Sequence, residues 1–137
     1  DEISRVINVN AIGTLRVTNA LSLLVLNSTE KTIVNISSEA GSIADCWRTG
    51  WFGYCMSKAA NNMQSALVHN NIRKLGGKVF AIHPGHVATY MRGHLDTTAK
   101  ITPDVSAEGI LHVVLDMPHP INSRPLYLDY TGKELLW

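Results

Sequence analysis

The sequence has 137 residues, a length typical of one domain, which we expect to span residues 1–137. Hydrophobic residues make up 45% and charged residues 17%, a balance that excludes intrinsic disorder. The net charge of +1 provides neither a basic footprint for nucleic acid nor a polybasic cluster for a membrane surface, so we expect neither partner. The longest apolar run, residues 20–26, is far shorter than the roughly 20 residues that span a bilayer. Cys46 and Cys55 are too few for a disulfide scaffold, so we expect reduced thiols in a cytoplasmic protein.

The first half of the chain predicts a helix, a strand and a second helix. Residues 2–26 carry apolar side chains at spacings of three and four, which predicts one helix that buries Ile3, Val6, Ile7, Ala11, Leu15, Leu21 and Val25. Residues 31–36 are β-branched and mostly apolar, as in a buried strand. A loop from Ala40 to about Trp51 follows. Residues 51–75 then predict a helix that ends at two glycines and packs through Ala59, Ala60, Met63, Ala66, Leu67 and Ile72.

The second half repeats the alternation. Residues 79–82 predict a buried strand, and residues 89–101 show no period and predict a surface loop. Thr102 before Pro103 is typical of a helix N-cap, and this helix should end near Met117. Residues 126–128 predict a third strand. The order indicates an α/β fold with a parallel sheet, helices on both faces and an unpaired edge at the first strand.

The sharpest candidate site is the pair Tyr54 and Lys58 in "YCMSK". Four residues apart on a helix, the two side chains share a face. A nearby ammonium favours the phenolate, so such a tyrosine can donate or accept a proton near neutral pH. On spacing alone, an ordinary exposed Tyr and Lys on a helix is the favoured interpretation, and Cys55 between them is expected to be an inert thiol.

Polar residues also follow the first two strands. Ser37 and Ser38 end the strand at residues 31–36, and the carboxyl ends of strands line the ligand crevice in α/β sheets. A serine there holds a carbonyl oxygen or only caps a turn. The segment "HPGH" at residues 83–86 should face the same crevice, where Gly85 permits close approach of the backbone to a ligand. His83 and His86 lack a third ligand and a helix between them, so we expect no metal site.

Together these motifs resemble the short-chain dehydrogenase/reductase family. "NVNAIG" is similar to the family's Asn-containing helix motif, and "IVNISSEAG" to its strand that ends in the catalytic Ser. "YCMSK" matches its Tyr-x-x-x-Lys motif, and "HPGHVAT" its Pro-Gly motif. All four occur in the family's order. The segment "HPGHVATYMRG" and the tail "LYLDYTGKELLW" look most like the sniffer and C-factor branch, and the resemblance runs to Trp137.

The resemblance implies an NAD(P)-dependent oxidoreductase of the carbonyl reductase or alcohol dehydrogenase type, acting on a small carbonyl or alcohol substrate. Tyr54 would be the general acid and base, and Lys58 would assist it and bind the nicotinamide ribose. Ser38, the second Ser of its motif, would hold the substrate carbonyl, and Asn10 would hold a water in a proton relay to Lys58. The loop at residues 90–101 would cover the substrate. The nicotinamide end of NADP or NAD would be bound by Tyr54, Lys58, Pro84, Gly85, Val87 and Thr89.

The resemblance also implies a partial Rossmann-like, doubly wound parallel sheet of about three strands. Family members are usually close to twice this length, and their N-terminal half holds four strands and the Gly-rich turn for the pyrophosphate. No such turn occurs in this sequence. The residue that selects NAD or NADP would lie in that half, so the sequence leaves this choice open.

Two functional interpretations therefore stay open. The first is the C-terminal half of an active reductase. The second is a non-catalytic truncated remnant that acts through protein–protein contacts. Under either interpretation, the helices at residues 2–26 and 51–75 match the pair that many family members use to form homodimers. A third interpretation, a plain α/β domain, does not account for the joint presence of Asn10, Ser38, Tyr54 and Lys58.

Overall fold

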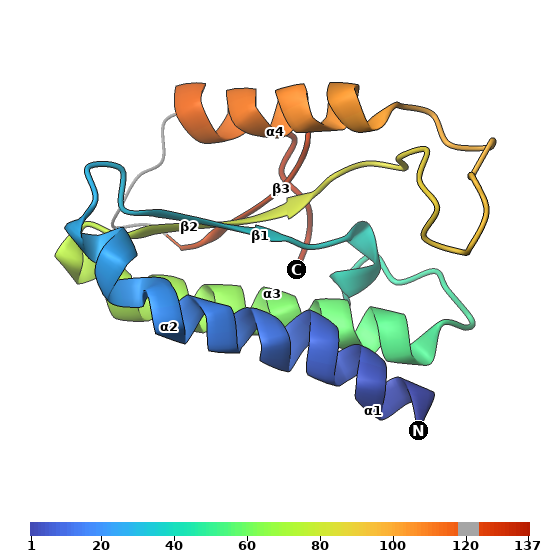
Figure 1. Ribbon diagram of the computed structural model, residues 1–137, viewed down its shortest axis with the longest axis horizontal. Helices are drawn as coiled ribbons and strands as arrows, with labels where there is room; N and C mark the ends of the chain where they lie inside the picture. The colour runs from blue at the N-terminus through green and yellow to red at the C-terminus, as the bar shows by residue number, and fades with distance from the viewer. Residues whose placement is uncertain (118–123) are drawn as a thin grey trace.

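The computed structural model describes residues 1–117 and 124–137, and its elements alternate between helix and strand (Figure 1). In chain order they are α1 (Glu2–Ile7), the π-helical turn η1 (Asn8–Gly13), α2 (Thr14–Asn27), β1 (Thr32–Ile36), the 3-10 turn η2 (Glu39–Gly41), α3 (Phe52–Ile72), the 3-10 turn η3 (Arg73–Leu75), β2 (Lys78–His83), α4 (Pro103–Asp116) and β3 (Leu126–Asp129). The predicted elements are all present, with η2 as a short addition inside the predicted loop.

The three strands form one parallel sheet in the order β1–β2–β3. Their register aligns Val34, Phe80 and Leu126 in one row and Asn35, Ala81 and Tyr127 in the next. Because side chains alternate between the faces of a sheet, adjacent rows serve opposite faces. The helices α1, α2 and α3 lie on one face and α4 on the other (Figure 1). The predicted α/β fold with helices on both faces is confirmed.

The apolar core lies on the α4 side of the sheet. Phe80, Ile82 and Leu128 are almost fully buried there against Val113 of α4. The N-terminus of α4 is capped as predicted, because the Thr102 side chain accepts a hydrogen bond from the backbone N–H of Val105. The helical segment α3–η3 ends at Gly76, which adopts φ +83°, a left-handed conformation that suits glycine and stops the helix.

The opposite layer is unexpectedly polar. Of the residues predicted to pack from α3, Ile72 is buried and Ala59 and Ala66 are half-buried, but the prediction is wrong for Ala60, Met63 and Leu67. Met63 and Leu67 are both 62% exposed, whereas α3 turns Ser57, Asn61, Asn62, Ser65 and His69 inward. The Asn35 amide of β1 donates a hydrogen bond to Ser65 Oγ at 2.8 Å, and Ser37 donates to Asn62 Oδ1. These bonds satisfy buried polar groups that would otherwise be costly to desolvate. Helical periodicity locates two faces of a helix, and here the polar one faces the sheet.

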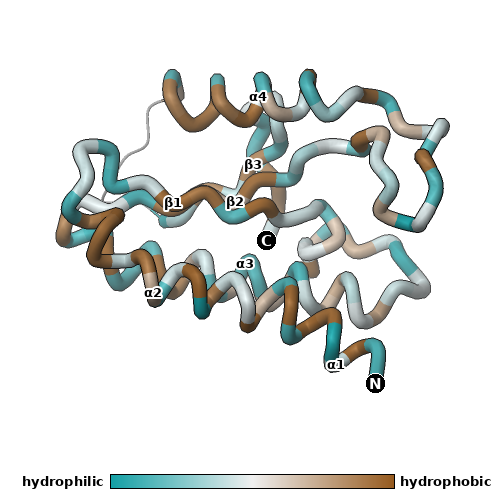
Figure 2. The backbone as a smooth tube through the Cα atoms, in the orientation of Figure 1, coloured by the Kyte–Doolittle hydropathy of each residue, from teal (hydrophilic) through white to brown (hydrophobic). Residues whose placement is uncertain are grey.

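The first predicted helix also differs in detail. It runs from Glu2 to Asn27, but its middle is the π-helical turn η1, and most of its predicted apolar face is not fully buried: Ala11 is buried, while Leu15 and Leu21 are exposed. Hydrophobic colour runs along α2 on the outside of the molecule (Figure 2). Among the described residues, this is the one helical segment long and apolar enough to cross a membrane, a test that helices of soluble proteins also pass. The expectation of no membrane partner stays a prediction.

The edge of β1 borders an open groove. Within the described sheet β1 pairs only with β2, as the predicted unpaired edge requires. A groove of about 640 Å³ separates this strand from α2, and its lining includes Gly13, Thr14, Val17, Leu21 and the whole of β1. Strand edges and apolar faces of this kind are normally covered in native proteins.

Candidate active site

Lys58 and Tyr54 share one face of α3, as their spacing predicts. The Lys58 ammonium lies 5.7 Å from the centre of the Tyr54 ring. It donates a hydrogen bond to the backbone oxygen of Ile36, at the carboxyl end of β1, over 3.0 Å. Burial lowers the pKa of Lys58, because desolvation disfavours the charged ammonium. One of its three N–H donors is used by Ile36, which leaves two for a ligand.

Ser38 lies at the same corner of the sheet, just beyond β1. Its side-chain oxygen accepts a hydrogen bond from the backbone N–H of Ala40 at 3.2 Å and so caps η2. The turn η2 lies close against α3: a Cβ placed on Gly41 would be 2.8 Å from the backbone of Lys58. Ser38 and Lys58 are therefore brought together. Because the Ser38 hydroxyl acts as an acceptor in the cap, its proton is available for donation to a carbonyl oxygen.

Asn10 lies in η1 and contacts α3 at Ser57, to which the sequence analysis gave no role. Its amide donates a hydrogen bond to Ser57 Oγ at 3.0 Å, and Ser57 in turn donates to the backbone oxygen of Tyr54 at 2.7 Å. π-helical turns are often found at functional sites. The structure thus links Asn10 to the Tyr54 turn through Ser57. The water relay to Lys58 stays a prediction.

The turn after β2 places the remaining predicted residues. Gly85 has φ +86°, and a Cβ there would lie 2.7 Å from Ile101. The carbonyl of Pro84 accepts a hydrogen bond from Ser106 at 2.6 Å, and Val87 pairs with Ile101 as an isolated β-bridge. The segment is held on both sides, while Thr89 is exposed. It forms a rigid rim at the carboxyl end of β2, where ligands bind in α/β sheets.

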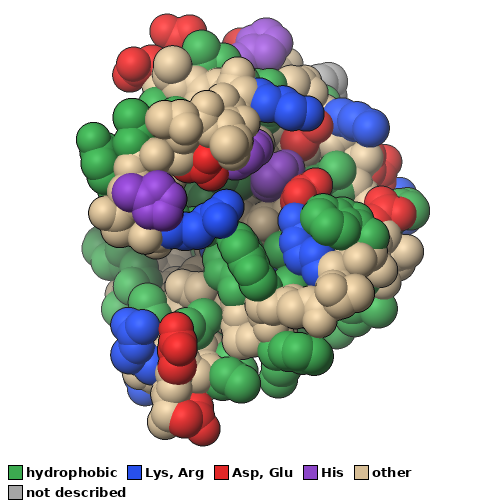
Figure 3. All heavy atoms as spheres, turned by 90° about the vertical axis from the view of Figure 1, so that its right-hand side faces the viewer, with side chains coloured by type: hydrophobic (Ala, Val, Ile, Leu, Met, Phe, Trp, Pro, Cys, Tyr) green, Lys and Arg blue, Asp and Glu red, His purple; other side chains and the backbone are tan. Residues whose placement is uncertain are grey.

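Residues of the loop that follows this turn lie near the Tyr54 ring and contact it through Trp51. The Arg92 guanidinium lies 5.1 Å from the centre of the Trp51 ring, and the Trp51 and Tyr54 rings meet edge to face at 5.9 Å. Asp96 pairs with His86 at 2.9 Å and with Arg92 at 3.7 Å. Hydrogen bonds from Thr98 and then His86 hold the pKa of Asp96 well below its usual range. Figure 3 views the molecule from this side, where histidine, basic and hydrophobic side chains lie next to one another.

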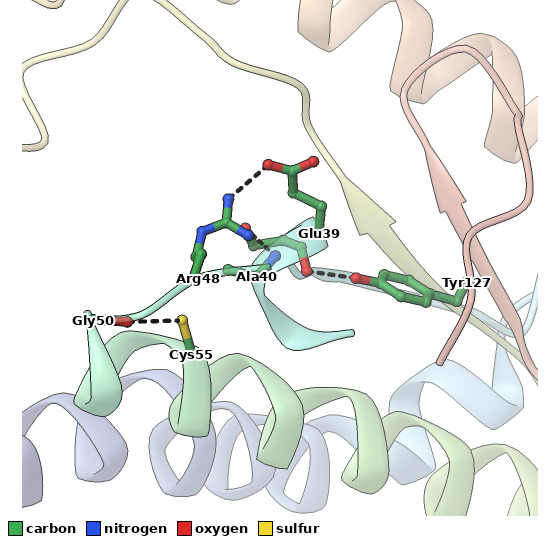
Figure 4. Close-up of polar contacts among 7 residues, drawn as sticks. Glu39, Ala40, Arg48, Gly50, Cys55 and Tyr127 are labelled. Carbon is green, nitrogen blue, oxygen red and sulfur yellow. Dashed lines mark hydrogen bonds and ion pairs between the residues drawn. The ribbon is translucent and has the colours of Figure 1, made fainter. Parts of the chain in front are cut away.

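The two histidines at residues 83 and 86 have separate surroundings. Burial lowers the pKa of His83, which favours its neutral form, and its Nδ1 has no hydrogen-bond partner in the described structure. His86 is paired with Asp96 instead. Across residues 1–117 and 124–137, no group of three His, Cys, Asp or Glu side chains is arranged to hold a metal ion. Both cysteines are free thiols, with Cys55 half-buried and 3.9 Å from the Gly50 oxygen (Figure 4).

The sequence patterns missed several residues of this corner. Tyr127 donates a buried hydrogen bond to the Ser38 carbonyl, and Ser57, Trp51 and Arg92 contact the Asn10–Tyr54 region. Ser57, Arg92 and Tyr127 lie inside quoted segments, but no chemical role was assigned to any of the four residues from the sequence. Only the alternation of β3 offered a signal for Tyr127, since it marks the face of the sheet on which that side chain lies.

Comparisons with known proteins agree on one family. The model of the short chain dehydrogenase family matches residues 1–100. C-signal of Myxococcus xanthus is 35% identical over 136 residues, which cover 99% of this chain and 79% of that protein. The 1-hydroxy-2-glutathionyl-2-methyl-3-butene dehydrogenase of Rhodococcus sp. (strain AD45) is 33% identical over 138 residues, which cover 100% of this chain and 59% of that enzyme.

Solved structures show the same fold. The NADPH-bound carbonyl reductase from chicken fatty liver superposes with a TM-score of 0.85 at 32% identity, over 98% of this chain and 57% of that one. The carbonyl reductase Sniffer of D. melanogaster has a TM-score of 0.83 at 21% identity, over 96% of this chain and 55% of that one, a likeness of fold alone. The chain spans little more than half the length of either structure.

Proposed function

Because the chain belongs to the short-chain dehydrogenase family, we propose that it carries the catalytic corner of an NAD(P)-dependent reductase for a small carbonyl compound, or of the reverse alcohol oxidation. One observation carries the proposal. Lys58 donates a hydrogen bond to the last residue of β1 and lies near the Tyr54 ring, Ser38 follows the same strand, and the Gly85 turn follows the neighbouring strand β2. The chicken relative is named as a carbonyl reductase and the Rhodococcus relative as a dehydrogenase, which supports this reaction class.

In this proposal Tyr54 is the general acid. Its hydroxyl donates a proton to the oxygen of the substrate carbonyl, and the Lys58 ammonium, 5.7 Å from the ring centre, stabilises the phenolate that remains. The Ser38 hydroxyl donates a hydrogen bond to the same oxygen and stabilises the charge that develops there. Asn10 supports the Tyr54 turn through Ser57 and is the entry point for a proton relay.

The residues at the turn after β2 fit the nicotinamide end of a dinucleotide. Gly85 adopts a positive φ, and Ile101 and the Tyr130 ring fill the place that a Cβ would take, so this turn is fixed by packing at the end of β2 and offers its backbone as one wall of the site. Pro84, Val87 and Thr89 would complete this side, and the two free donors of Lys58 would bind ribose hydroxyls. A bound reduced nicotinamide would supply the hydride. No Gly-rich turn for the pyrophosphate is present in the 137 residues, so the choice between NAD and NADP stays open.

Three further expectations remain proposals. The exposed apolar faces of α2 and α3 favour a homodimer through the helices at residues 2–26 and 51–75. The free thiols favour the reducing cytoplasm. The alternative function, a non-catalytic remnant that acts through protein contacts, is favoured by the same apolar faces and by the open groove along β1.

The test of this function is reductase activity in the protein made from its complete reading frame. A panel of aldehydes and ketones is offered with NADPH or NADH, and loss of nicotinamide absorbance is followed. We expect turnover that falls at least about 100-fold in Tyr54→Phe, because general acid catalysis contributes about that much or more. The matched variant Tyr130→Phe should keep its rate, since no hydrogen bond of its hydroxyl occurs in the described structure. Equal activity of Tyr54→Phe and the wild type would refute the role of Tyr54, and a wild type that reduces no compound of the panel would favour the remnant.

A further inference from the structure

We propose that Tyr127, from the last strand of the sheet, is a positioning residue for the Ser38 hydroxyl and thereby sets the rate of the chemical step. The inference rests on the proposed function, because it needs Ser38 to hold the substrate carbonyl. Tyr127 lies outside residues 1–100, the part of the chain that the family model matches. Its role is argued from the contacts of this chain alone.

The contact joins two distant parts of the chain. The Tyr127 hydroxyl donates a hydrogen bond of 2.5 Å to the backbone oxygen of Ser38, across 89 positions of sequence (Figure 4). The Tyr127 side chain is completely buried, with 0% of its surface exposed. In the register of the sheet, Tyr127 is paired with Ala81, which is paired with Asn35. The small side chain of Ala81 leaves space on this face for the phenol ring to extend toward the end of β1.

The hydroxyl group of Tyr127 is a dependable donor in this place. Burial raises its pKa, so the group stays protonated through the neutral range and keeps its hydrogen for Ser38. Its ring contacts the Trp137 ring at 5.2 Å, and its backbone oxygen accepts a hydrogen bond from Leu135 at 2.8 Å. The carbonyl of Trp137 accepts another from Ala44 at 3.1 Å. The C-terminal residues therefore hold both Tyr127 and the loop that follows Ser38.

The bond from Tyr127 acts on the orientation of Ser38. With its carbonyl held by Tyr127 and its Oγ held by the N–H of Ala40, Ser38 is anchored at both its backbone and its side chain. Without the first bond, a buried carbonyl loses its partner and the backbone at Ser38 is freer to rotate. A hydroxyl displaced by a fraction of an ångström would then donate less well to a carbonyl oxygen, because such stabilisation depends on preorganised geometry.

A double-mutant cycle tests this role in the protein made from its complete reading frame. Tyr127→Phe keeps the ring that packs on Trp137 and removes only the hydroxyl. We expect kcat to fall about tenfold, a fraction of the effect of losing a carbonyl-binding donor outright, while KM for the cofactor stays unchanged. In a Ser38→Ala background the same substitution should cause no further loss of kcat. Tyr130→Phe is the matched control and should leave kcat unchanged in both backgrounds.

The outcomes separate this inference from the proposed function. The proposed function and the positioning role are both overturned if the wild type is inactive, or if Tyr54→Phe is as active as the wild type. If the wild type is active and Tyr127→Phe matches it in kcat, only the positioning role is overturned. A loss in Tyr127→Phe that persists undiminished in the Ser38→Ala background also overturns it, since that pattern belongs to a general structural effect. A tenfold loss confined to proteins with Ser38 supports it.

Discussion

The Lys58 ammonium lies 3.0 Å from the backbone oxygen of Ile36, so the middle of α3 is tied to the carboxyl end of β1. This bond places the ammonium between the strand end and the Tyr54 ring, 5.7 Å away. Burial lowers its pKa from 10.5, which makes Lys58 a group whose protonation differs between the folded and unfolded chain. The same geometry that would assist Tyr54 therefore has a consequence for stability.

Folding should become more favourable with rising pH as Lys58 loses its proton. The folded chain binds that proton more weakly than the unfolded chain, so the stability cost is present throughout the range below the folded pKa. It is relieved as pH rises from the lowered pKa toward 10.5. The thermal unfolding midpoints of the wild type and of Lys58→Met are measured across this pH range, and the midpoint of the wild type should rise relative to that of the variant. Lys74→Met, at an exposed lysine, is the control. If the midpoint of the wild type rises by the same amount relative to Lys74→Met, the effect does not belong to Lys58.

Gly85→Ala should destabilise the chain. At φ +86° an alanine is strained, and its Cβ would lie 2.7 Å from Ile101, so we expect a loss of about 1–3 kcal/mol in the free energy of unfolding. Urea unfolding measures this loss. Gly50→Ala is the matched control, because nothing lies within 4 Å of the new Cβ and its φ is ordinary. Similar stabilities for the two variants would show that the Gly85 turn is not rigid.

Asn10 and Ser57 should be energetically coupled. Their hydrogen bond of 3.0 Å joins η1 to α3, and Ser57 is fully buried. Either alanine substitution removes the bond, so a double-mutant cycle of Asn10→Ala and Ser57→Ala should give a coupling energy of about 1 kcal/mol. Urea unfolding of the four proteins supplies the cycle. Additive losses would mean that the Asn10 amide is not held by Ser57.

The apolar outer face of α3 should mediate self-association. Met63 and Leu67 are each 62% exposed, and charges placed there would oppose a helix-to-helix contact. We expect Met63→Glu plus Leu67→Glu to convert a dimer to a monomer in sedimentation velocity. Leu115→Glu, on the outer face of α4, places a charge at a comparably exposed leucine and should leave the dimer intact. A wild type that stays monomeric at high concentration would refute the homodimer.

The sequence predicted the elements better than the faces they bury. Alternating helix and strand patterns located the parallel sheet, and the Thr102–Pro103 cap and the glycine at 76 marked helix ends correctly. The periodicity of α3 did not reveal that its polar side faces β1, because the hydrogen bonds that Ser65 Oγ and Asn62 Oδ1 accept come from Asn35 and Ser37 of a distant segment. For the same reason Tyr127 was missed, since its partner Ser38 lies 89 positions away. Residues 118–123, which lie outside the described part of the structure, contain none of the predicted site residues.

Local motifs were sufficient for the residues that share one turn or one strand end. Tyr54 and Lys58 lie on one helix face, and Ser38 follows β1, so spacing and strand order were enough to bring them together. The π-helical turn that carries Asn10 has no such signature in the sequence. Asn10 was therefore located on the correct helix, while its partner Ser57 was not foreseen.

In the proposed function, Tyr54, Lys58 and the turn at residues 84–89 form a nicotinamide site. A titration of NADPH and of NADH into the 137-residue chain, followed by nicotinamide fluorescence and the shift in thermal unfolding, tests this site. We expect saturable binding with a Kd of roughly micromolar order. This binding should be lost in Tyr54→Phe plus Lys58→Ala and kept in Tyr130→Phe plus Lys74→Ala. A folded chain that binds neither cofactor at millimolar concentration, or that binds equally well in both double variants, would contradict it.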